Sequence, residues 1–251
     1  MMITKAAEAY HEKMFPNYQS SFLETDPEFI TLFDNFAFDT VINQADFDNK
    51  TRMQVILAVL IGCQSLAEYK AMLPAALNFG VSPIVVKEII YQAVAYLGIG
   101  RVYPFLIATN DILTEKGIAL PLANQATVTE KTRLSDGEAA QIAIFGEEMK
   151  GFAQSGPKLS RHINQWLTEN CFGDYYTRTG LDLKQRELLT ACFLLAQGGC
   201  EPQLIAHFKA NIRLGNDPEF LVTMISQCIP YIGYPRCLNA LRCLTEAEMN
   251  E

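Results

Sequence analysis

The chain has 251 residues, of which 49% are hydrophobic and 19% charged, and its formal net charge is −8. This acidic balance, without a basic cluster, argues against nucleic acid or an anionic membrane as the main partner. The first fifteen residues lack the apolar core of a signal peptide and no run of about 18 apolar residues occurs, so we expect a cytoplasmic protein. Its seven cysteines are then expected to be thiols.

Helical signals dominate the chain, and no sustained period-two alternation competes with them. The predicted fold class is therefore all-α. The predicted helices, in chain order, are about 48–62, 65–79, 83–97, 137–154, 159–169, 182–198, 201–214 and 218–232. The N-terminal arm is expected to be irregular or to form short helices. Residues 114–136 are rich in polar and turn-forming residues and are expected to be a connector.

An internal repeat divides the chain into two copies. Matching residues 135 positions apart are Gly80 and Gly215, Pro83 and Pro218, Ile90 and Ile225, Gln92 and Gln227, Tyr96 and Tyr231, Gly98 and Gly233, and Arg101 and Arg236. Further upstream the offset is 134, where Asp48 and Arg52 match Asp182 and Arg186. This spacing of four predicts a local Asp–Arg ion pair in each copy. Because duplicated copies diverge, differences between them indicate where chemistry could lie.

The second copy contains several sequence motifs in order. They are Arg-Glu-Leu-Leu-Thr at 186–190, a glycine turn, Glu-Pro-Gln-Leu-Ile-Ala-His at 201–207 and Tyr-Ile-Gly-Tyr-Pro at 231–235. These motifs resemble the carboxymuconolactone decarboxylase family, which shares its helical fold with the alkylhydroperoxidase D-like proteins. The resemblance covers about 160–245 and, less closely, 28–110. It implies an arm (1–27), a first module with a degenerate site (28–113), a connector (114–136) and a second module with the candidate site (137–251).

Glu187 and His207 match the family positions of a catalytic acid–base pair. Glu187 lies about eleven residues before the turn at Gly198–Gly199 and His207 about eight after it. In an antiparallel helix pair the axial mismatch is about 5 Å, within reach of a hydrogen bond through one water. A carboxylate beside an imidazole fixes its tautomer and raises its basicity. The alternative is a histidine satisfied in a helix interface and a solvated glutamate.

The first copy has Met53 and Met72 at the matching positions, and thioethers cannot transfer protons. This copy is therefore either scaffold or part of a shared pocket. The predicted helix 65–79 of this copy corresponds to helix 201–214, which carries His207. Its only polar candidates are Glu68, Tyr69 and Lys70, which we expect to be mostly solvated.

Cys200 is the third candidate catalytic residue, because a thiol at a helix N-terminus has a stabilised thiolate. In alkylhydroperoxidase D-like proteins a Cys-x-x-Cys pair lies at about this place, but here the sequence is Cys-Glu-Pro-Gln and the resolving cysteine is absent. The alternative is an incidental turn cysteine. Five further cysteines lie on or beside apolar helical positions, and we expect them to pack as small hydrophobic residues: Cys171, Cys192, Cys228, Cys237 and Cys243.

No cofactor or metal is predicted, since the three histidines, His11, His162 and His207, share no ligand spacing. Arg101 and Arg236 are interpreted as helix-end residues or, alternatively, as ligands of a substrate carboxylate. The leading function is cofactor-free acid–base chemistry, decarboxylation or isomerisation, on a small carboxylated or lactone-like metabolite. The alternatives are a thiol peroxidase using Cys200 and a non-catalytic scaffold.

We also expect a homo-oligomer, most simply a trimer of tandem modules. The apolar residues of helix 83–97 extend beyond one face, so this helix needs more partners than one small module offers.

Overall fold

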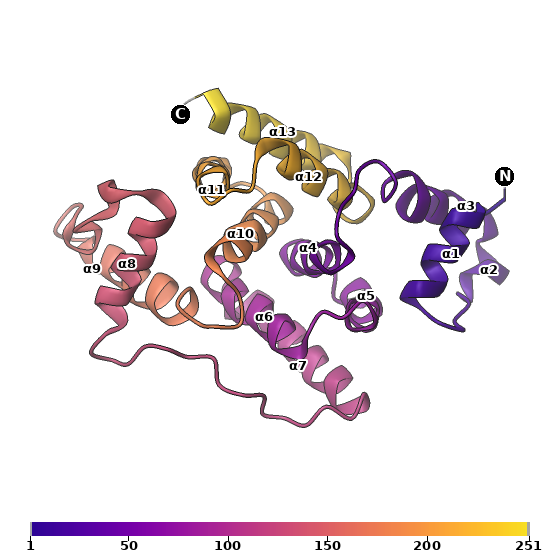
Figure 1. The fold of residues 1–251 in the computed structure, drawn as a ribbon, viewed down its shortest axis with the longest axis horizontal. Helices are drawn as coiled ribbons and strands as arrows, with labels where there is room; N and C mark the ends of the chain where they lie inside the picture. The colour runs from indigo at the N-terminus through magenta and orange to yellow at the C-terminus, as the bar shows by residue number, and fades with distance from the viewer. Residues whose placement is uncertain (1, 250–251) are drawn as a thin grey trace.

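A computed structural model describes residues 2–249, and all their regular secondary structure is helical (Figure 1). The all-α prediction is therefore confirmed. The α-helices are α1 (Lys5–Met14), α2 (Phe22–Thr25), α3 (Pro27–Asn35), α4 (Asn49–Gly62), α5 (Leu66–Asn78), α6 (Pro83–Leu97), α7 (Ile99–Glu115), α8 (Arg133–Phe145), α9 (Arg161–Trp166), α10 (Leu183–Gln197), α11 (Glu201–Arg213), α12 (Pro218–Ile232) and α13 (Tyr234–Met249). Two π-helical segments, η1 (Phe36–Thr40) and η4 (Leu167–Tyr175), and two 3-10 turns, η2 (Glu147–Met149) and η3 (Phe152–Gln154), complete the set. None of these helices is long and apolar enough to span a bilayer.

The repeated helices begin and end where local sequence signals place them. The Ser82 side chain accepts a hydrogen bond from the backbone N–H of Val85 at the start of α6, and Asp217 caps α12 in the same way. Gly98 and Gly233 end these helices with φ of +77° and +79°, a conformation that favours glycine. Helices α7 and α13 follow directly, and neither is among the helices predicted from the sequence.

Two predicted helices differ from the observed ones. The helix predicted over 137–154 begins earlier, as α8, and ends at Phe145, because Gly146 has φ of +119° and leads into the 3-10 turns. The helix predicted over 159–169 is α9, and it continues as the wider turns of η4 to Tyr175. The N-terminal arm contains α1 and α2, and α1 packs against α5 and η1 as α8 packs against α11 and η4.

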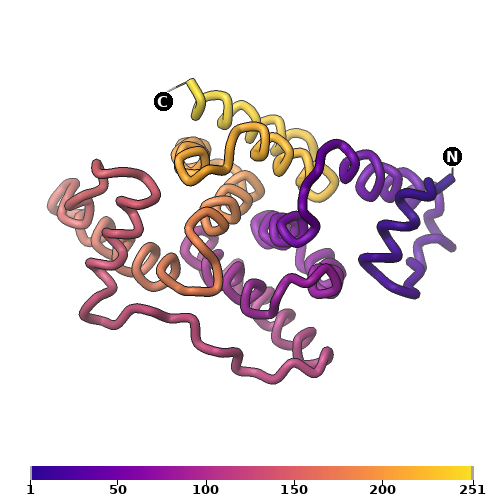
Figure 2. The backbone as a smooth tube through the Cα atoms, in the orientation of Figure 1, coloured from indigo at the N-terminus to yellow at the C-terminus, as the bar shows by residue number. Residues whose placement is uncertain are grey.

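The two copies are interleaved around a central pair of helices. In Figure 1, α4 and α10 lie in the middle of the molecule, with α5–α7 on one side and α11–α13 on the other. A side chain at Gly62, the last residue of α4, would place its Cβ 2.7 Å from that of Ala196 on α10, so glycine permits the close approach. Helix α6 contacts α4, α7, α10 and η4, so its many apolar residues find partners within the chain. The connector runs along one edge from α7 to α8 (Figure 2).

The predicted Asp–Arg ion pairs are wrong in both copies. Asp48 and Asp182 instead accept hydrogen bonds from backbone N–H groups as helix caps. The Arg52 Nε donates to Gln227 Oε1 at 2.9 Å, and the Arg186 Nη1 donates to Gln92 Oε1 at 2.9 Å. Each arginine therefore turns inward and binds the repeated glutamine of the other copy, which joins the copies through buried polar contacts.

Candidate functional site

Glu187 and His207 meet directly in the structure. The turn between α10 and α11 contains Gly198 and Gly199 with φ of +70° and +71°, which reverses the chain and brings the two helices together. The Nδ1 atom of His207 lies 2.6 Å from Oε2 of Glu187, so no bridging water is needed. The Glu187 side chain is fully buried and that of His207 is 10% exposed. The solvated glutamate of the alternative interpretation is therefore excluded.

Asn211 fixes the register of the two helices that carry the pair. It lies on α11, and its amide donates to the backbone carbonyl of Glu187 at 2.9 Å and to that of His207 at 2.8 Å. Asn216 donates in turn to Oδ1 of Asn211 at 2.8 Å. Because these buried amides are satisfied by backbone atoms of both helices, the carboxylate and the imidazole are held at a fixed separation.

A chain of hydroxyl groups leads to the other oxygen of Glu187. Tyr176, which follows η4, donates to Oε1 of Glu187 at 2.8 Å. The Tyr176 oxygen is also 2.6 Å from the Thr190 hydroxyl and 2.5 Å from that of Tyr96. Beyond Tyr96, the Cys171 thiol lies 3.8 Å from the Tyr96 hydroxyl. Both carboxylate oxygens of Glu187 are thus engaged, one by the imidazole and one by a phenol.

The direction of these hydrogen bonds follows from the number of protons. An ionised carboxylate only accepts, so Tyr176 uses its single hydroxyl proton on Glu187. Tyr96 and Thr190 must then both donate to the Tyr176 oxygen, and the amide of Gln92, 2.9 Å from Thr190 Oγ1, donates to Thr190. Every donor in the chain points toward Glu187, so the network stabilises a negative charge there.

Burial keeps the members of this network protonated. Burial, reinforced by the Glu187 charge, raises the pKa of Tyr176 well above its ordinary value. Burial also raises the pKa of Tyr96, followed by the effects of Cys171 and Glu187. The pKa of Cys171 rises to about 12, again chiefly through burial. These groups are therefore hydrogen-bond donors near neutral pH.

The first copy completes the site of the second. Gln92 and Tyr96 belong to α6 of the first copy, whereas Glu187, His207 and Tyr176 belong to the second. Both α6 residues recur in the repeat, which is a sequence signal, but neither is among the predicted site residues. Thr190 lies within a recognised motif, and no sequence signal singled out Tyr176. These two side chains of the first copy take part in the hydrogen-bond network around Glu187, and the shared pocket stays a prediction.

The imidazole of His207 lies between two aromatic rings. Tyr96 and Phe145 contact it edge-on, with centroids 5.6 and 5.4 Å from that of the imidazole. Phe145 is the last residue of α8 and is half-buried. Glu187 engages Nδ1, so Nε2 is the ring nitrogen left for chemistry. The cavities of about 740 and 610 Å³ are lined by other residues.

Cys200 lies at the start of α11, separate from the pair. No hydrogen bond within residues 2–249 joins its thiol to Glu187 or His207; the thiol contacts the Leu194 carbonyl and the Gln197 amide. Burial raises the pKa of Cys200, and the hydrogen bond from Gln197 only partly offsets this effect, so the expected stabilised thiolate is not found. Burial likewise raises the pKa of Cys63. The positive charge of Arg236 lowers the pKa of both thiols, but by less than burial raises it. The five other cysteines are buried, as expected.

The matching residues of the first copy are part of an apolar interior. Met53 and Met72 are buried, and Met72 lines the cavity of about 740 Å³. Tyr69 is not solvated as expected, because it is fully buried and its hydroxyl lies 2.7 Å from Thr109 Oγ1. Glu68 is half-buried, which raises its pKa. No acid–base pair exists at this position.

The repeated arginines Arg101 and Arg236 lie near the turn that precedes α11 rather than at the pair. Arg101 Nη1 donates to Gln197 Oε1 at 3.2 Å. A Cβ added at Gly198 would lie 2.6 Å from Arg236 Nη1. Within residues 2–249, no cluster of three or more His, Cys, Asp or Glu side chains could hold a metal ion.

Comparison with known proteins gives one family match. The profile of the carboxymuconolactone decarboxylase family matches residues 27–111 and 162–246. A crystal structure from Burkholderia xenovorans, provisionally assigned as a gamma-carboxymuconolactone decarboxylase subunit, matches with a TM-score of 0.54 and 18% sequence identity. The match covers 98% of this chain and 97% of that one and shows a shared fold. No curated protein matches significantly.

Proposed function

Because this chain belongs to the carboxymuconolactone decarboxylase family, we propose that it is a cofactor-free acid–base enzyme with His207 as the proton-transferring group. The observation that carries the proposal is the direct 2.6 Å contact between His207 Nδ1 and the buried Glu187 carboxylate. A buried carboxylate at Nδ1 holds the proton on that nitrogen, directs Nε2 outward as the reacting atom and stabilises the imidazolium. Tyr176 keeps the carboxylate oriented through Oε1.

The substrate class proposed is a small carboxylated or lactone-like metabolite. In a decarboxylation, the bond between the carboxylate carbon and the neighbouring carbon breaks, CO₂ leaves, and the electron pair stays on the substrate as a carbanion or dienolate. His207 then delivers a proton from Nε2 to that carbon, and Glu187 stabilises the protonated ring before transfer. In an isomerisation, Nε2 removes a proton from one carbon and returns it to another. Neither path needs a second protein acid.

Substrate access at Phe145 is part of this proposal. The His207 ring is only 10% exposed, and the ring of Phe145 packs edge-on against it. Phe145 lies at the end of α8, directly before Gly146, whose φ of +119° marks a turn. A displacement of this helix end would expose the imidazole, and it would break the hydrogen bond that Arg213 Nη1 at the end of α11 donates to the Phe145 carbonyl at 3.3 Å. Phe145→Ala should therefore change KM clearly, while the melting temperature should change only slightly.

The redox alternative has less support in the structure. A thiol peroxidase needs a nucleophilic thiolate, and burial raises the pKa of Cys200. Within the described residues, Cys200 also makes no contact with His207 or Glu187 that would let the pair act as its base. The acid–base proposal therefore ranks first, and the scaffold alternative is an outcome of its test.

The test compares His207→Gln and Glu187→Gln with wild type in a screen of carboxylated and lactone substrates. Each substitution should lower activity by about 10²–10⁴-fold, and the double substitution should cost little more, because the pair acts as a unit. Met53→Leu and Met72→Leu are matched controls at the equivalent positions of the first copy and should keep full activity. Full activity of the Glu187 and His207 variants on a confirmed substrate would show that the pair is structural.

We also propose that the chain forms a homo-oligomer, most simply a trimer, built from modules at 28–113 and 137–251. Three apolar residues one turn apart on α7, Ile99, Tyr103 and Ile107, are exposed, which is the pattern of an uncovered helix face. Tyr234 and Leu238, the repeat equivalents of Ile99 and Tyr103 on α13, are exposed as well. Light scattering should give a mass near three times 28.1 kDa, and a monomeric mass at micromolar concentration would contradict the proposal.

A further inference from the structure

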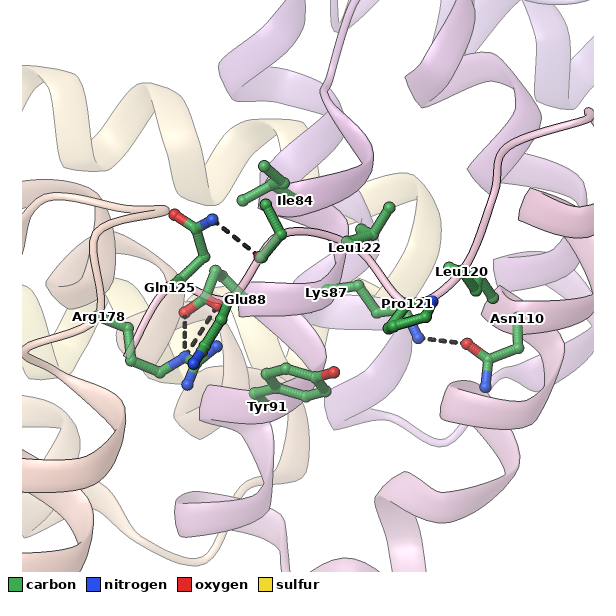
Figure 3. Close-up of a pocket in the computed structure, with 12 residues that line it drawn as sticks. Ile84, Lys87, Glu88, Tyr91, Asn110, Leu120, Pro121, Leu122, Gln125 and Arg178 are labelled. Carbon is green, nitrogen blue, oxygen red and sulfur yellow. Dashed lines mark hydrogen bonds and ion pairs between the residues drawn. The ribbon is translucent and has the colours of Figure 1, made fainter. Parts of the chain in front are cut away.

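A cavity of about 610 Å³ lies between α6, the end of α7 and the connector, away from the acid–base pair (Figure 3). Its lining is mixed. Ile84, Tyr91 and Leu122 provide apolar surface, while Lys87 and Arg178 provide positive charge. Figure 3 shows the two charged groups on opposite sides of Tyr91, with connector residues above them. Its volume, apolar surface and few charged groups fall within the range of small-molecule sites.

Lys87 is a buried cation without an anionic partner. Its residue is 8% exposed, and its Nζ hydrogen-bonds to Oδ1 of Asn110, which carries no charge. No ion pair among the described residues includes Lys87. Burial lowers the pKa of Lys87, as desolvation of a cation should. Lys87 therefore lines the cavity with a neutral hydrogen-bond partner and with no carboxylate partner among the described residues, which leaves its charge available to an anion.

Glu88 cannot supply that anion, because two arginines already engage it. Arg178 Nε lies 2.9 and 3.0 Å from its two carboxylate oxygens, and Arg186 Nη2 lies 3.0 Å from Oε2. One carboxylate thus faces two guanidinium groups, and with Lys87 the cluster has an excess of two positive charges. Both bonds from Arg178 to Glu88 come from Nε, so its terminal Nη groups are not used by that ion pair.

We propose that this cavity binds a small organic acid, with its carboxylate at the Lys87 ammonium and its apolar body against Tyr91, Ile84 and Leu122, and that Arg178 adds positive charge to the same cavity. The carboxylate supplies the negative charge that the cluster lacks, and the apolar wall selects an organic acid over an inorganic anion. The site is distinct from the acid–base pair, since Glu88 and Tyr96 are eight residues apart on α6, or about 12 Å along the helix. The inference therefore does not depend on the proposed catalytic function.

Binding is tested with benzoate as the probe and benzamide as its uncharged analogue, by titration calorimetry and thermal shift on the full chain. Benzoate should bind and raise the melting temperature, and benzamide should bind at least tenfold more weakly. Lys87→Met keeps the side-chain length but removes the charge, and should weaken benzoate binding at least tenfold. Lys131→Met makes the same change at an exposed connector position and should leave binding unchanged. His207→Gln should also bind benzoate as wild type does.

Asn110→Asp provides a second test if Lys87→Met does not fold. The new carboxylate would lie beside Lys87 and neutralise it, so the unliganded protein should melt at a higher temperature and lose most of its stabilisation by benzoate. Equal binding of benzoate and benzamide would overturn the proposal, as would wild-type benzoate affinity in both the Lys87 and Asn110 variants. Loss of benzoate binding in His207→Gln alone would place the anion at the acid–base pair and also refute this site.

Discussion

Removal of the Tyr176 hydroxyl is predicted to lower the free energy of unfolding more than removal of any other single hydroxyl at the candidate site. Tyr176→Phe removes a hydrogen bond to the buried Glu187 carboxylate at 2.8 Å and the two bonds that Tyr96 and Thr190 donate to the Tyr176 oxygen. A bond to a charged group contributes about 1.5–3 kcal/mol and each neutral bond about 1 kcal/mol. The expected loss of unfolding free energy is therefore about 3.5–5 kcal/mol, at the upper end for a single substitution.

Tyr69→Phe is the matched control for this measurement. Tyr69 is also fully buried, but its hydroxyl makes one bond, to the neutral Thr109 at 2.7 Å. Its loss should cost about 1 kcal/mol. Both variants are compared with wild type by urea unfolding, where a shifted midpoint at constant slope reports stability.

A double-substitution cycle separates the charged bond from the neutral ones. In a Glu187→Gln background the charged bond becomes a neutral one, so Tyr176→Phe should cost about 0.5–2 kcal/mol less than it does in wild type. If Tyr176→Phe costs no more than Tyr69→Phe, or if its cost is the same in both backgrounds, the assignment of Tyr176 as donor to an ionised Glu187 is wrong.

Three further predictions concern other parts of the molecule. Because burial raises the pKa of Cys200, its alkylation by iodoacetamide should be slower at pH 7 than that of a free thiol, and should accelerate as pH rises through the raised pKa, as mass spectrometry of the modified peptide would record. Met53→Leu and Met72→Leu should each change stability by less than about 1.5 kcal/mol in urea unfolding. Tyr103→Asp should dissociate the oligomer in light scattering, and an unchanged mass would move the interface away from α7.

The sequence determined the local structure of the repeated helices. Helices α6 and α12 begin at Ser82 and Asp217 and end at Gly98 and Gly233, because capping and φ preference act within a few residues. The family motifs indicated Glu187 and His207, and a short glycine turn between two helices was enough to place them near one another. The same local reasoning failed for α8, where Gly146 ends the helix before the predicted boundary.

Only the tertiary structure decided what surrounds the pair. Tyr96 reaches Tyr176 across 80 positions of sequence, and Gln92 reaches Thr190 across 98, because α6 of one copy packs against η4 and α10 of the other. The same interleaving explains the failed ion-pair prediction. Arg186 gains buried partners in Gln92 and Glu88, and that gain exceeds what an exposed pair with Asp182 offers. Periodicity shows that a helix has an apolar face, but which side chains meet across it depends on how the helices cross.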